Sequence, residues 1–303
     1  MSAPVVCLVG ATASGKSALI ERVAQMIAPT PLEVVSADSR QLYRGLDIGT
    51  AKYRGPVVHH LVDTLSPTEP YSSARFANDA VAAITAVRAR GAIPVVVGGT
   101  GFYVRALALG VAQPPPPDPN LRRQLQHELE QGGQAWLRAE LERIDPVSAR
   151  KIAPRDHYRA LRALEIYRQT GRPRSSFATP SALRAGYVLI GLARERAELY
   201  DRIDARVRQM FAAGLVDELQ AILASGVRPD APGLRTIGYR ELIACGAPTV
   251  DTAALQRAAE LIARNTRRYA KRQATFFRTM PIEQWVEAND AGVRQLAARI
   301  LGA

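Results

Sequence analysis

The chain has 303 residues, 47% of them hydrophobic, which is enough for a large α/β domain that carries an insertion. No apolar run approaches the roughly 20 residues that span a bilayer, and no signal-peptide pattern is present, so we expect a cytoplasmic protein. Cys7 and Cys245 have no partner at metal-ligand spacing and are expected to be reduced. The formal charge of +12 suggests a polyanionic partner.

The strongest motif is a phosphate-binding loop near the N-terminus. Residues 10–17 fit G-x-x-x-x-G-K-[ST] without mismatch, between an apolar run at 5–9 and a helical pattern at 16–28. Glycines let such a loop curl, so that its amides and the N-terminus of the next helix point at one anion. The lysine adds charge, and the serine offers a hydroxyl to Mg²⁺. The motif predicts that a di- or triphosphate is held by Gly10, Ala11, Thr12, Ala13, Ser14, Gly15, Lys16 and Ser17.

Polar residues also follow two other predicted strands. The strand at 32–36 runs into Asp38, Ser39, Arg40 and Gln41, and ligand residues of parallel sheets gather at the carboxyl ends of strands. Asp38 alone could equally cap a following helix, but its polar neighbours favour a functional role.

A second polar segment follows the strand at 93–97, where glycines surround Thr100. These glycines suggest that the backbone approaches a ligand closely, with a plain tight turn as the alternative. A further strand is predicted at 57–63. Its pair of histidines indicates a structural role more than a metal site.

Four prolines at 114–117 interrupt the alternation of strands and helices and predict a stiff linker. Helical patterns follow, beginning at Asp118, before a strand returns at 187–192. The predicted fold is therefore α/β, a P-loop NTPase-like core whose parallel sheet is flanked by helices, with an all-helical insertion. The core is expected at residues 1–113 and 186–303, and the insertion at 114–185.

A long helix is predicted from residue 252 to about 280. Apolar residues recur there every seven positions, and a neighbouring face carries a cationic stripe of Arg264, Arg267, Arg268, Lys271 and Arg272. Solvated helix faces usually mix charges of both signs, whereas no acid lies between residues 264 and 278. The stripe therefore predicts a surface for a phosphate backbone, and a solvated face is the alternative.

Taken together, these segments resemble the tRNA dimethylallyltransferases, also called tRNA isopentenyltransferases. The chain departs from the family pattern at Ala11, where proline is usual, and at 276–277, where Phe-Phe replaces a pair containing tryptophan. Two cysteines cannot supply the zinc finger of the eukaryotic members, so the resemblance is to the bacterial type. The motifs that carry it lie at 10–17, 36–44, 47–52, 59–63, 98–101, 159–165, 237–240 and 266–273.

The resemblance implies that the loop holds the pyrophosphate of dimethylallyl pyrophosphate, with Mg²⁺ on Ser17 and Arg206 reaching the same group. It implies that Asp38 is the general base for N6 of adenosine 37 and that Thr100 bonds near the bridging oxygen. No protein partner or membrane is indicated. The residues expected to contact the tRNA anticodon stem-loop are Asp38, Ser39, Arg40, Gln41, Thr100, Arg122, Arg159, Arg162, Arg235, Arg240, Lys271, Arg272, Gln273 and Arg278.

Three other functions compete with this one. A P-loop kinase for a small molecule or nucleotide explains the loop but not the basic insertion or the stripe. A nucleic-acid-binding module without prenyl transfer explains the charge but not Asp38 and Thr100 beside a phosphate loop. Prenylation of free adenine nucleotides would need neither the insertion nor the stripe. A GTPase is disfavoured because no Asn-Lys-x-Asp motif occurs.

Overall fold

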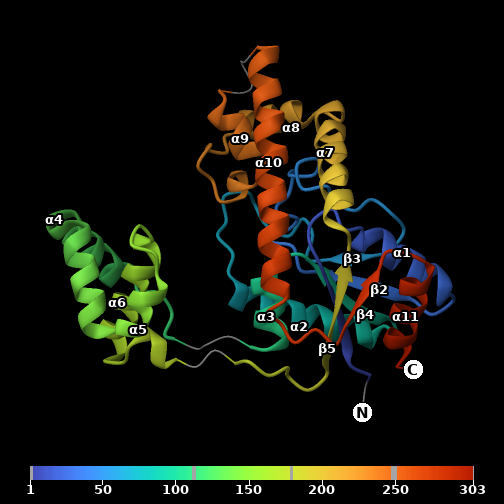
Figure 1. The fold of residues 1–303 in the computed structure, drawn as a ribbon, viewed down its shortest axis with the longest axis horizontal. Helices are drawn as coiled ribbons and strands as arrows, with labels where there is room; N and C mark the ends of the chain where they lie inside the picture. The colour runs from blue at the N-terminus through green and yellow to red at the C-terminus, as the bar shows by residue number, and fades with distance from the viewer. Residues whose placement is uncertain (1–2, 111–113, 178–179, 247–250, 303) are drawn as a thin grey trace. The chain divides into compact units, whose positions relative to one another are not determined.

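The computed structural model describes residues 3–110, 114–177, 180–246 and 251–302. The chain forms two compact units, a core unit of Met1–Gly110 and Ala182–Ala303 and an inserted unit of Val111–Ser181, drawn mainly in green in Figure 1. The predicted boundary at residue 113 lies outside the described residues.

The core unit is built on a six-stranded sheet in which every pairing is parallel. Strand β1 (Val5–Val9), in the interior of the sheet, is fully buried, as its continuous apolar run predicted. Its side chains alternate between two hydrophobic clusters, with Val5 and Cys7 in one and Val6 and Leu8 in the other. In spatial order the strands are β3 (His59–His60), β2 (Leu32–Ser36), β4 (Ile93–Gly98), β1 (Val5–Val9), β5 (Tyr187–Ala193) and β6 (Gln284–Glu287).

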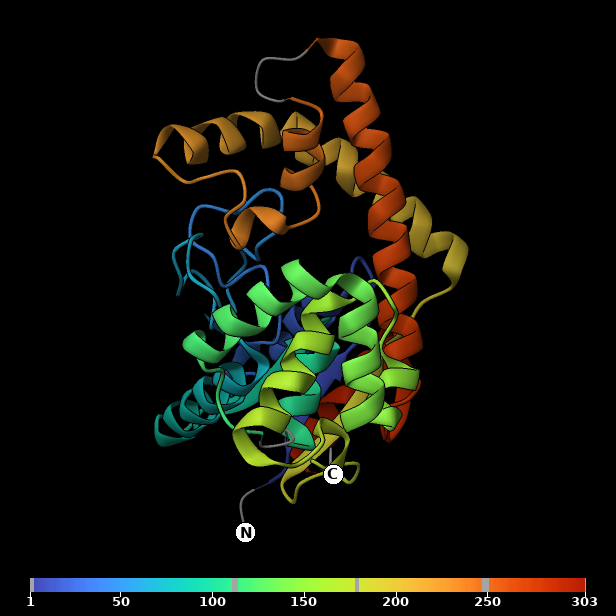
Figure 2. The same ribbon diagram turned by 90° about the vertical axis from the view of Figure 1, so that its left-hand side faces the viewer.

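Helices cover both faces of this sheet (Figures 1 and 2). On one face, α1 and α11 pack against each other and contribute to the same cluster. The other face carries α2 and α3, which contact the strands, and apolar residues of α8, α9 and α10 join them in the larger cluster. The helices of the core unit are α1 (Lys16–Met26), α2 (Ser73–Ala89), α3 (Gly101–Ala108), α7 (Arg196–Ala212), α8 (Leu215–Ala224), α9 (Tyr239–Ala244), α10 (Thr252–Phe277) and α11 (Asp290–Leu301).

The register of the strands aligns the segments that were singled out in the sequence. Val9 pairs with Gly98, and Val97 pairs with Ser36. Because the strands are parallel, the phosphate loop, the polar segment after β2 and the glycine turn after β4 all leave the sheet at the same edge. The two-residue β3 is shorter than the strand predicted at 57–63.

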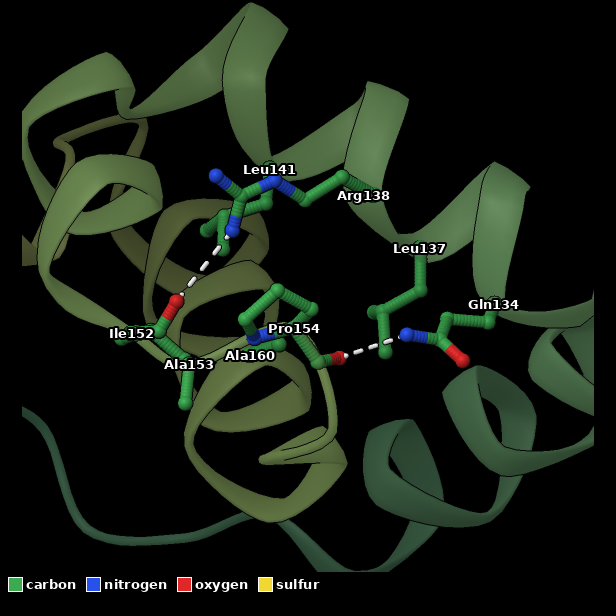
Figure 3. A pocket seen from close by; sticks show the side chains of 8 residues that line it. All are labelled: Gln134, Leu137, Arg138, Leu141, Ile152, Ala153, Pro154 and Ala160. Atoms are coloured by element: carbon green, nitrogen blue, oxygen red, sulfur yellow. Dashed lines mark hydrogen bonds between the residues drawn. The ribbon is translucent and has the colours of Figure 1, made fainter.

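The inserted unit is helical, with α4 (Pro119–Ile144), α5 (Pro146–Lys151) and α6 (His157–Thr170) around its own apolar cluster. Asp118 caps α4 as expected, accepting hydrogen bonds from the amides of residues 120 and 121. Gly133 adopts a non-helical φ of 65° and kinks α4. Beyond the kink, Gln134 and Arg138 donate to the carbonyls of Pro154 and Ile152 at 3.0 and 3.2 Å (Figure 3). The cavity there, about 10 Å³, has room for one water molecule.

Candidate active site

A cavity of about 620 Å³ opens in the core unit where the three strand ends meet. It is lined from the phosphate loop, the segment after β2, the turn after β4, and helices α7 and α10. Most of the predicted site residues lie on its wall: Thr12, Ala13, Gly15, Lys16, Ser17, Asp38, Ser39, Arg40, Gln41, Thr100, Arg206, Arg235, Arg240, Arg272 and Gln273.

The phosphate loop curls through two left-handed residues, Ala13 at a φ of 63° and Gly15 at 99°. Lys16 Nζ folds back over the loop and donates to the carbonyls of Gly10 and Ala11 at 3.0 and 2.8 Å. Burial lowers the pKa of Lys16 to about 8, Asp38 works against this shift, and Arg206 adds to it. A buried ammonium bonded to neutral carbonyls has no bound counter-charge, and an anion in the cavity would provide one.

The three loop residues that do not line the cavity are Gly10, Ala11 and Ser14, which are buried. The Ser14 hydroxyl is buried with no hydrogen-bond partner among the described residues.

Two arginines of α7 reach the loop from the side. Arg206 Nη1 lies 3.3 Å from Thr12 Oγ1, and Arg202 Nε donates to the Ala13 carbonyl at 2.8 Å. Burial lowers the pKa of Arg206, Arg202 lowers it further, and Asp38 opposes the shift. Sequence analysis selected Arg206 and missed Arg202, although an arginine four residues earlier on the helix was the available signal. Two guanidinium groups that repel each other beside a phosphate loop make an anion site.

Asp38 and Thr100 are brought together by the pairing of β2 and β4. Thr100 Oγ1 accepts a hydrogen bond from the Ser39 amide at 2.9 Å. Asp38 Oδ1 accepts one from the Arg40 amide at 2.8 Å, which closes a turn. The next helix begins only at Ser73, so the alternative of a helix cap for Asp38 is wrong. Its carboxylate instead lines the cavity that also contains Lys16.

The glycine turn after β4 has a different cause from the one that its sequence suggested. A Cβ on Gly99 would lie 2.4 Å from Gln273 Nε2, and one on Gly101 would lie 2.3 Å from Phe276 Cδ1. These glycines therefore leave room for side chains of α10 and not for a ligand. The close approach was predicted correctly, but its partner is protein.

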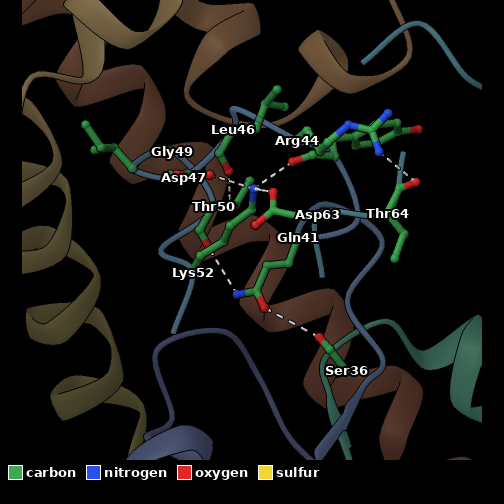
Figure 4. A network of polar contacts seen from close by, with 12 residues as sticks. Ser36, Gln41, Arg44, Leu46, Asp47, Gly49, Thr50, Lys52, Asp63 and Thr64 are labelled. Atoms are coloured by element: carbon green, nitrogen blue, oxygen red, sulfur yellow. Dashed lines mark hydrogen bonds and ion pairs between the residues drawn. The ribbon is translucent and has the colours of Figure 1, made fainter. Parts of the chain in front are cut away.

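Figure 4 shows the loop that connects β2 to β3, where Gln41 acts as an internal tie. Its Nε2 donates to the Thr50 carbonyl at 3.2 Å, and its Oε1 accepts from the Ser36 hydroxyl at 3.4 Å. Buried Lys52 donates to the Tyr43 carbonyl at 2.7 Å, to Asp47 at 2.6 Å and to Asp63. The network fixes the part of the loop that lines the cavity.

Glu218 of α8 fixes the same loop from the outside, and sequence analysis did not select it. Its carboxylate accepts the amides of Asp47 and Ile48 at 2.8 Å each and that of Gly49 at 3.2 Å. The Tyr239 hydroxyl donates to it at 2.5 Å. Nothing in the sequence around Glu218 signals this role, because its partners are backbone amides 170 residues away.

The remaining predicted RNA contacts do not line the cavity. Lys271 is exposed on α10, and Arg278 is exposed directly after the end of this helix. The cationic stripe is not free of acids as the sequence suggested, since Arg267 is paired with Asp204 of α7. Linear spacing along one helix did not reveal an acid contributed by its neighbour.

The inserted unit holds the other three arginines. Arg122 and Arg162 lie 3.2 and 3.0 Å from the carboxylate of fully buried Glu165. Arg159 pairs with Asp156 at 2.7 Å. The buried carboxylate thus orients two guanidinium groups on this unit.

Two kinds of feature are not found among the described residues. No cluster of three or more His, Cys, Asp or Glu side chains there could hold a metal ion. None of their helices is long and apolar enough to cross a membrane. The ring of His59 lies 2.9 Å from the Val57 carbonyl, and that of His60 lies 2.5 Å from the Glu33 carboxylate.

The known proteins that are similar to this chain are of one kind. A family model described as IPP transferase matches residues 41–280. A tRNA dimethylallyltransferase of Thermomicrobium roseum is 43% identical over 98% of this chain and 90% of its own length.

Two solved structures are also similar over nearly the whole chain. The tRNA isopentenylpyrophosphate transferase of Bacillus halodurans is 36% identical, with a TM-score of 0.68, and the match covers 99% of this chain and 96% of that one. A eukaryotic dimethylallyltransferase described as acting on tRNA is 27% identical, with a TM-score of 0.81, and the match covers 98% of this chain and 78% of that one.

Proposed function

Because the chain belongs to the IPP transferase family of tRNA dimethylallyltransferases, we propose that it transfers the dimethylallyl group of dimethylallyl pyrophosphate to N6 of adenosine 37 in tRNA. One observation carries the proposal furthest. Asp38, an acceptor, lines the same cavity as the cations Lys16 and Arg206. A carboxylate beside a phosphate site either helps to hold a cation or accepts a proton. A site that also removes a proton needs such an acceptor.

The donor half of the reaction belongs to the phosphate loop. As the bond between C1 of the prenyl group and its oxygen breaks, negative charge grows on the departing pyrophosphate. Lys16 and Arg206, with Arg202 beside them, stabilise that charge, and this kind of electrostatic term is often the largest in catalysis. The guanidinium groups are held by the loop itself before the donor arrives, so little reorganisation accompanies the reaction.

The residues present fit a Mg²⁺ ion that arrives with the donor. Ser17 lines the cavity and offers one hydroxyl, and Mg²⁺ commonly takes one or two protein ligands while phosphate oxygens and water complete its shell. Ser17 would hold the ion, which would supply further positive charge to the leaving group.

The acceptor half belongs to Asp38 and Thr100. The N6 amine is a weak nucleophile, because its lone pair is conjugated with the adenine ring. As the nitrogen forms its bond to C1, the Asp38 carboxylate takes the proton that N6 releases. Thr100 Oγ1 accepts the Ser39 amide, and its hydroxyl would donate to the bridging oxygen. The adenine must leave the stack of the anticodon loop to reach the cavity.

The rest of the anticodon stem-loop would be bound by positive charge. Arg235, Arg240 and Arg272 are exposed residues that line the cavity, and Arg122 and Arg162 are oriented by a buried carboxylate. Arginines that contact the backbone of a single-stranded loop are common in RNA recognition. With tRNA as its substrate, the enzyme is expected to act in the cytoplasm.

A product assay tests the proposal against its rivals. The protein is incubated with labelled dimethylallyl pyrophosphate or ATP, and with tRNA or AMP. We expect label in tRNA from the prenyl donor alone, at one adenosine in the anticodon loop. Label passing from ATP to a small molecule would favour the kinase, and prenylated AMP would favour the free-nucleotide reaction.

A further inference from the structure

We propose that Gln273 is a positioning residue that fixes the phosphate loop relative to the turn carrying Thr100, and that it does not contact RNA as the sequence pattern implied. The inference rests on the proposed function, because the two segments hold the donor and the general-base side of the reaction. Gln273 lies on α10 and is 6% exposed.

The Gln273 amide spans the two segments. Its Oε1 accepts the Thr12 amide at 2.8 Å, and its Nε2 donates to the Gly99 carbonyl at 2.7 Å. An amide donor requires the oxygen and a carbonyl acceptor requires the nitrogen, so only one orientation of the side chain satisfies both. A single rigid group therefore sets the separation of a loop residue and a turn residue that are 87 positions apart in the chain.

Thr12 is held from its other side as well. Its hydroxyl lies 3.3 Å from Arg206 Nη1, so Gln273 and Arg206 act on one residue from two helices. One turn earlier on α10, Tyr269 lines the same cavity as Thr100, and burial raises the pKa of the Tyr269 hydroxyl. Helix α10 therefore contacts both the phosphate loop and the turn that carries Thr100.

On the side of the turn, no free space remains around the Gln273 amide. A Cβ on Gly99 would come within 2.4 Å of Nε2, so the turn leaves room for this contact and for no larger group. A base or phosphate that used the Gln273 amide would have to displace a backbone partner, and either loss would leave a buried backbone group unpaired.

Two substitutions separate the bonds. Gln273→Glu keeps an oxygen for the Thr12 amide but removes the donor to Gly99, whereas Gln273→Met preserves the length of the side chain and removes both. Gln256→Met is the control, because Gln256 is an exposed residue on the same helix. Five quantities are measured: the affinity for inorganic pyrophosphate with Mg²⁺, kcat and KM for the donor, the Kd for tRNA, and the melting temperature.

We expect Gln273→Met to lower kcat/KM for the donor by about 10- to 100-fold, since a misplaced loop costs reactivity on this scale. Pyrophosphate affinity should fall with it, and tRNA Kd should stay within about twofold. Gln273→Glu should be at least as harmful as Gln273→Met, because its second carboxylate oxygen faces the Gly99 carbonyl.

A rise in tRNA Kd with unchanged donor constants would overturn the inference, and so would constants for both variants that match Gln256→Met. If the natural protein failed to prenylate tRNA, the proposed function would fail. The pyrophosphate affinities would still decide the role of Gln273.

Discussion

Asp38 is held by one of its two carboxylate oxygens. Oδ1 accepts the Arg40 amide at 2.8 Å and closes the turn after β2. Because the side-chain oxygen of asparagine can accept the same bond, Asp38→Asn preserves the turn and removes only the basicity. We expect the chemical step to slow by about 10²- to 10⁴-fold, with both substrates still bound. Single-turnover prenylation at saturating tRNA and donor measures this step, and a rate within a few-fold of the natural enzyme would exclude the general-base role.

Lys16 makes donor binding dependent on pH. Burial lowers its pKa from 10.5 to about 8 in the folded protein, so between these values the unfolded chain binds the proton that the folded chain has lost. This residue therefore makes the free energy of unfolding rise with pH over that window. A bound pyrophosphate favours the charged lysine, so its affinity should fall as pH rises above about 8.

Calorimetry of pyrophosphate binding at pH 7 and pH 9 checks the prediction for Lys16. Pyrophosphate exchanges protons of its own, and Lys16→Gln, which has no lysine proton to gain, reports that exchange at each pH. The natural protein should take up nearly one proton more than the variant at pH 9 and almost the same number at pH 7. Identical uptake by the natural protein and by the variant at pH 9 would contradict the prediction.

At the scale of the element, α10 combines two functions on different faces. Its buried face carries Gln273 to the phosphate loop, and its exposed face carries Lys271 and Arg272. If these cations contact phosphates, each alanine substitution should flatten the slope of log affinity for tRNA against log salt by about one unit. Arg267→Ala is the matched control, because that guanidinium is already paired with Asp204. If the salt slopes of all three variants equalled that of the natural protein, this face of α10 would contact only solvent.

Elements with strong local signals were predictable, and those defined by distant partners were not. The apolar run of β1, the phosphate loop and the cap at Asp118 appeared as expected. Strand β6 and helix α11 were missed, since the four residues of β6 include only one buried side chain. Its position is set by pairing with β5, which a single sequence does not display.

The residues of the candidate site also divide into those with a local sequence signal and those defined by distant partners. Lys16, Asp38 and Thr100 could be selected because each follows a recognisable strand. Glu218 could not, because it acts on backbone amides, and the partner of Arg267 could not, because it comes from another helix. Sequence patterns identified the segments that meet around the cavity. The hydrogen bonds that join those segments required coordinates.

At the scale of the whole molecule, the two connections of the inserted unit start from one place in the core. The Arg184 amide donates to the Ala108 carbonyl at 2.8 Å, so the chain leaves and returns at hydrogen-bonded neighbours. Replacing residues 111–181 with a short Gly-Ser linker should therefore leave the core folded. Its pyrophosphate affinity should stay within a few-fold, while tRNA affinity should fall. A truncated protein that neither melts cooperatively nor binds pyrophosphate would show that the core depends on the insertion.

This common point of exit and return determines how the enzyme would fail. Each unit has its own apolar cluster, and to the core an unfolded insertion is merely a long loop. Doubling the length of such a loop costs only about 0.6 kcal/mol. Harmful substitutions in the inserted unit should then produce a protein that persists in the cell and still sequesters the prenyl donor but leaves tRNA unmodified. Such alleles would compete with intact enzyme for donor, whereas damage to the sheet would simply remove the protein.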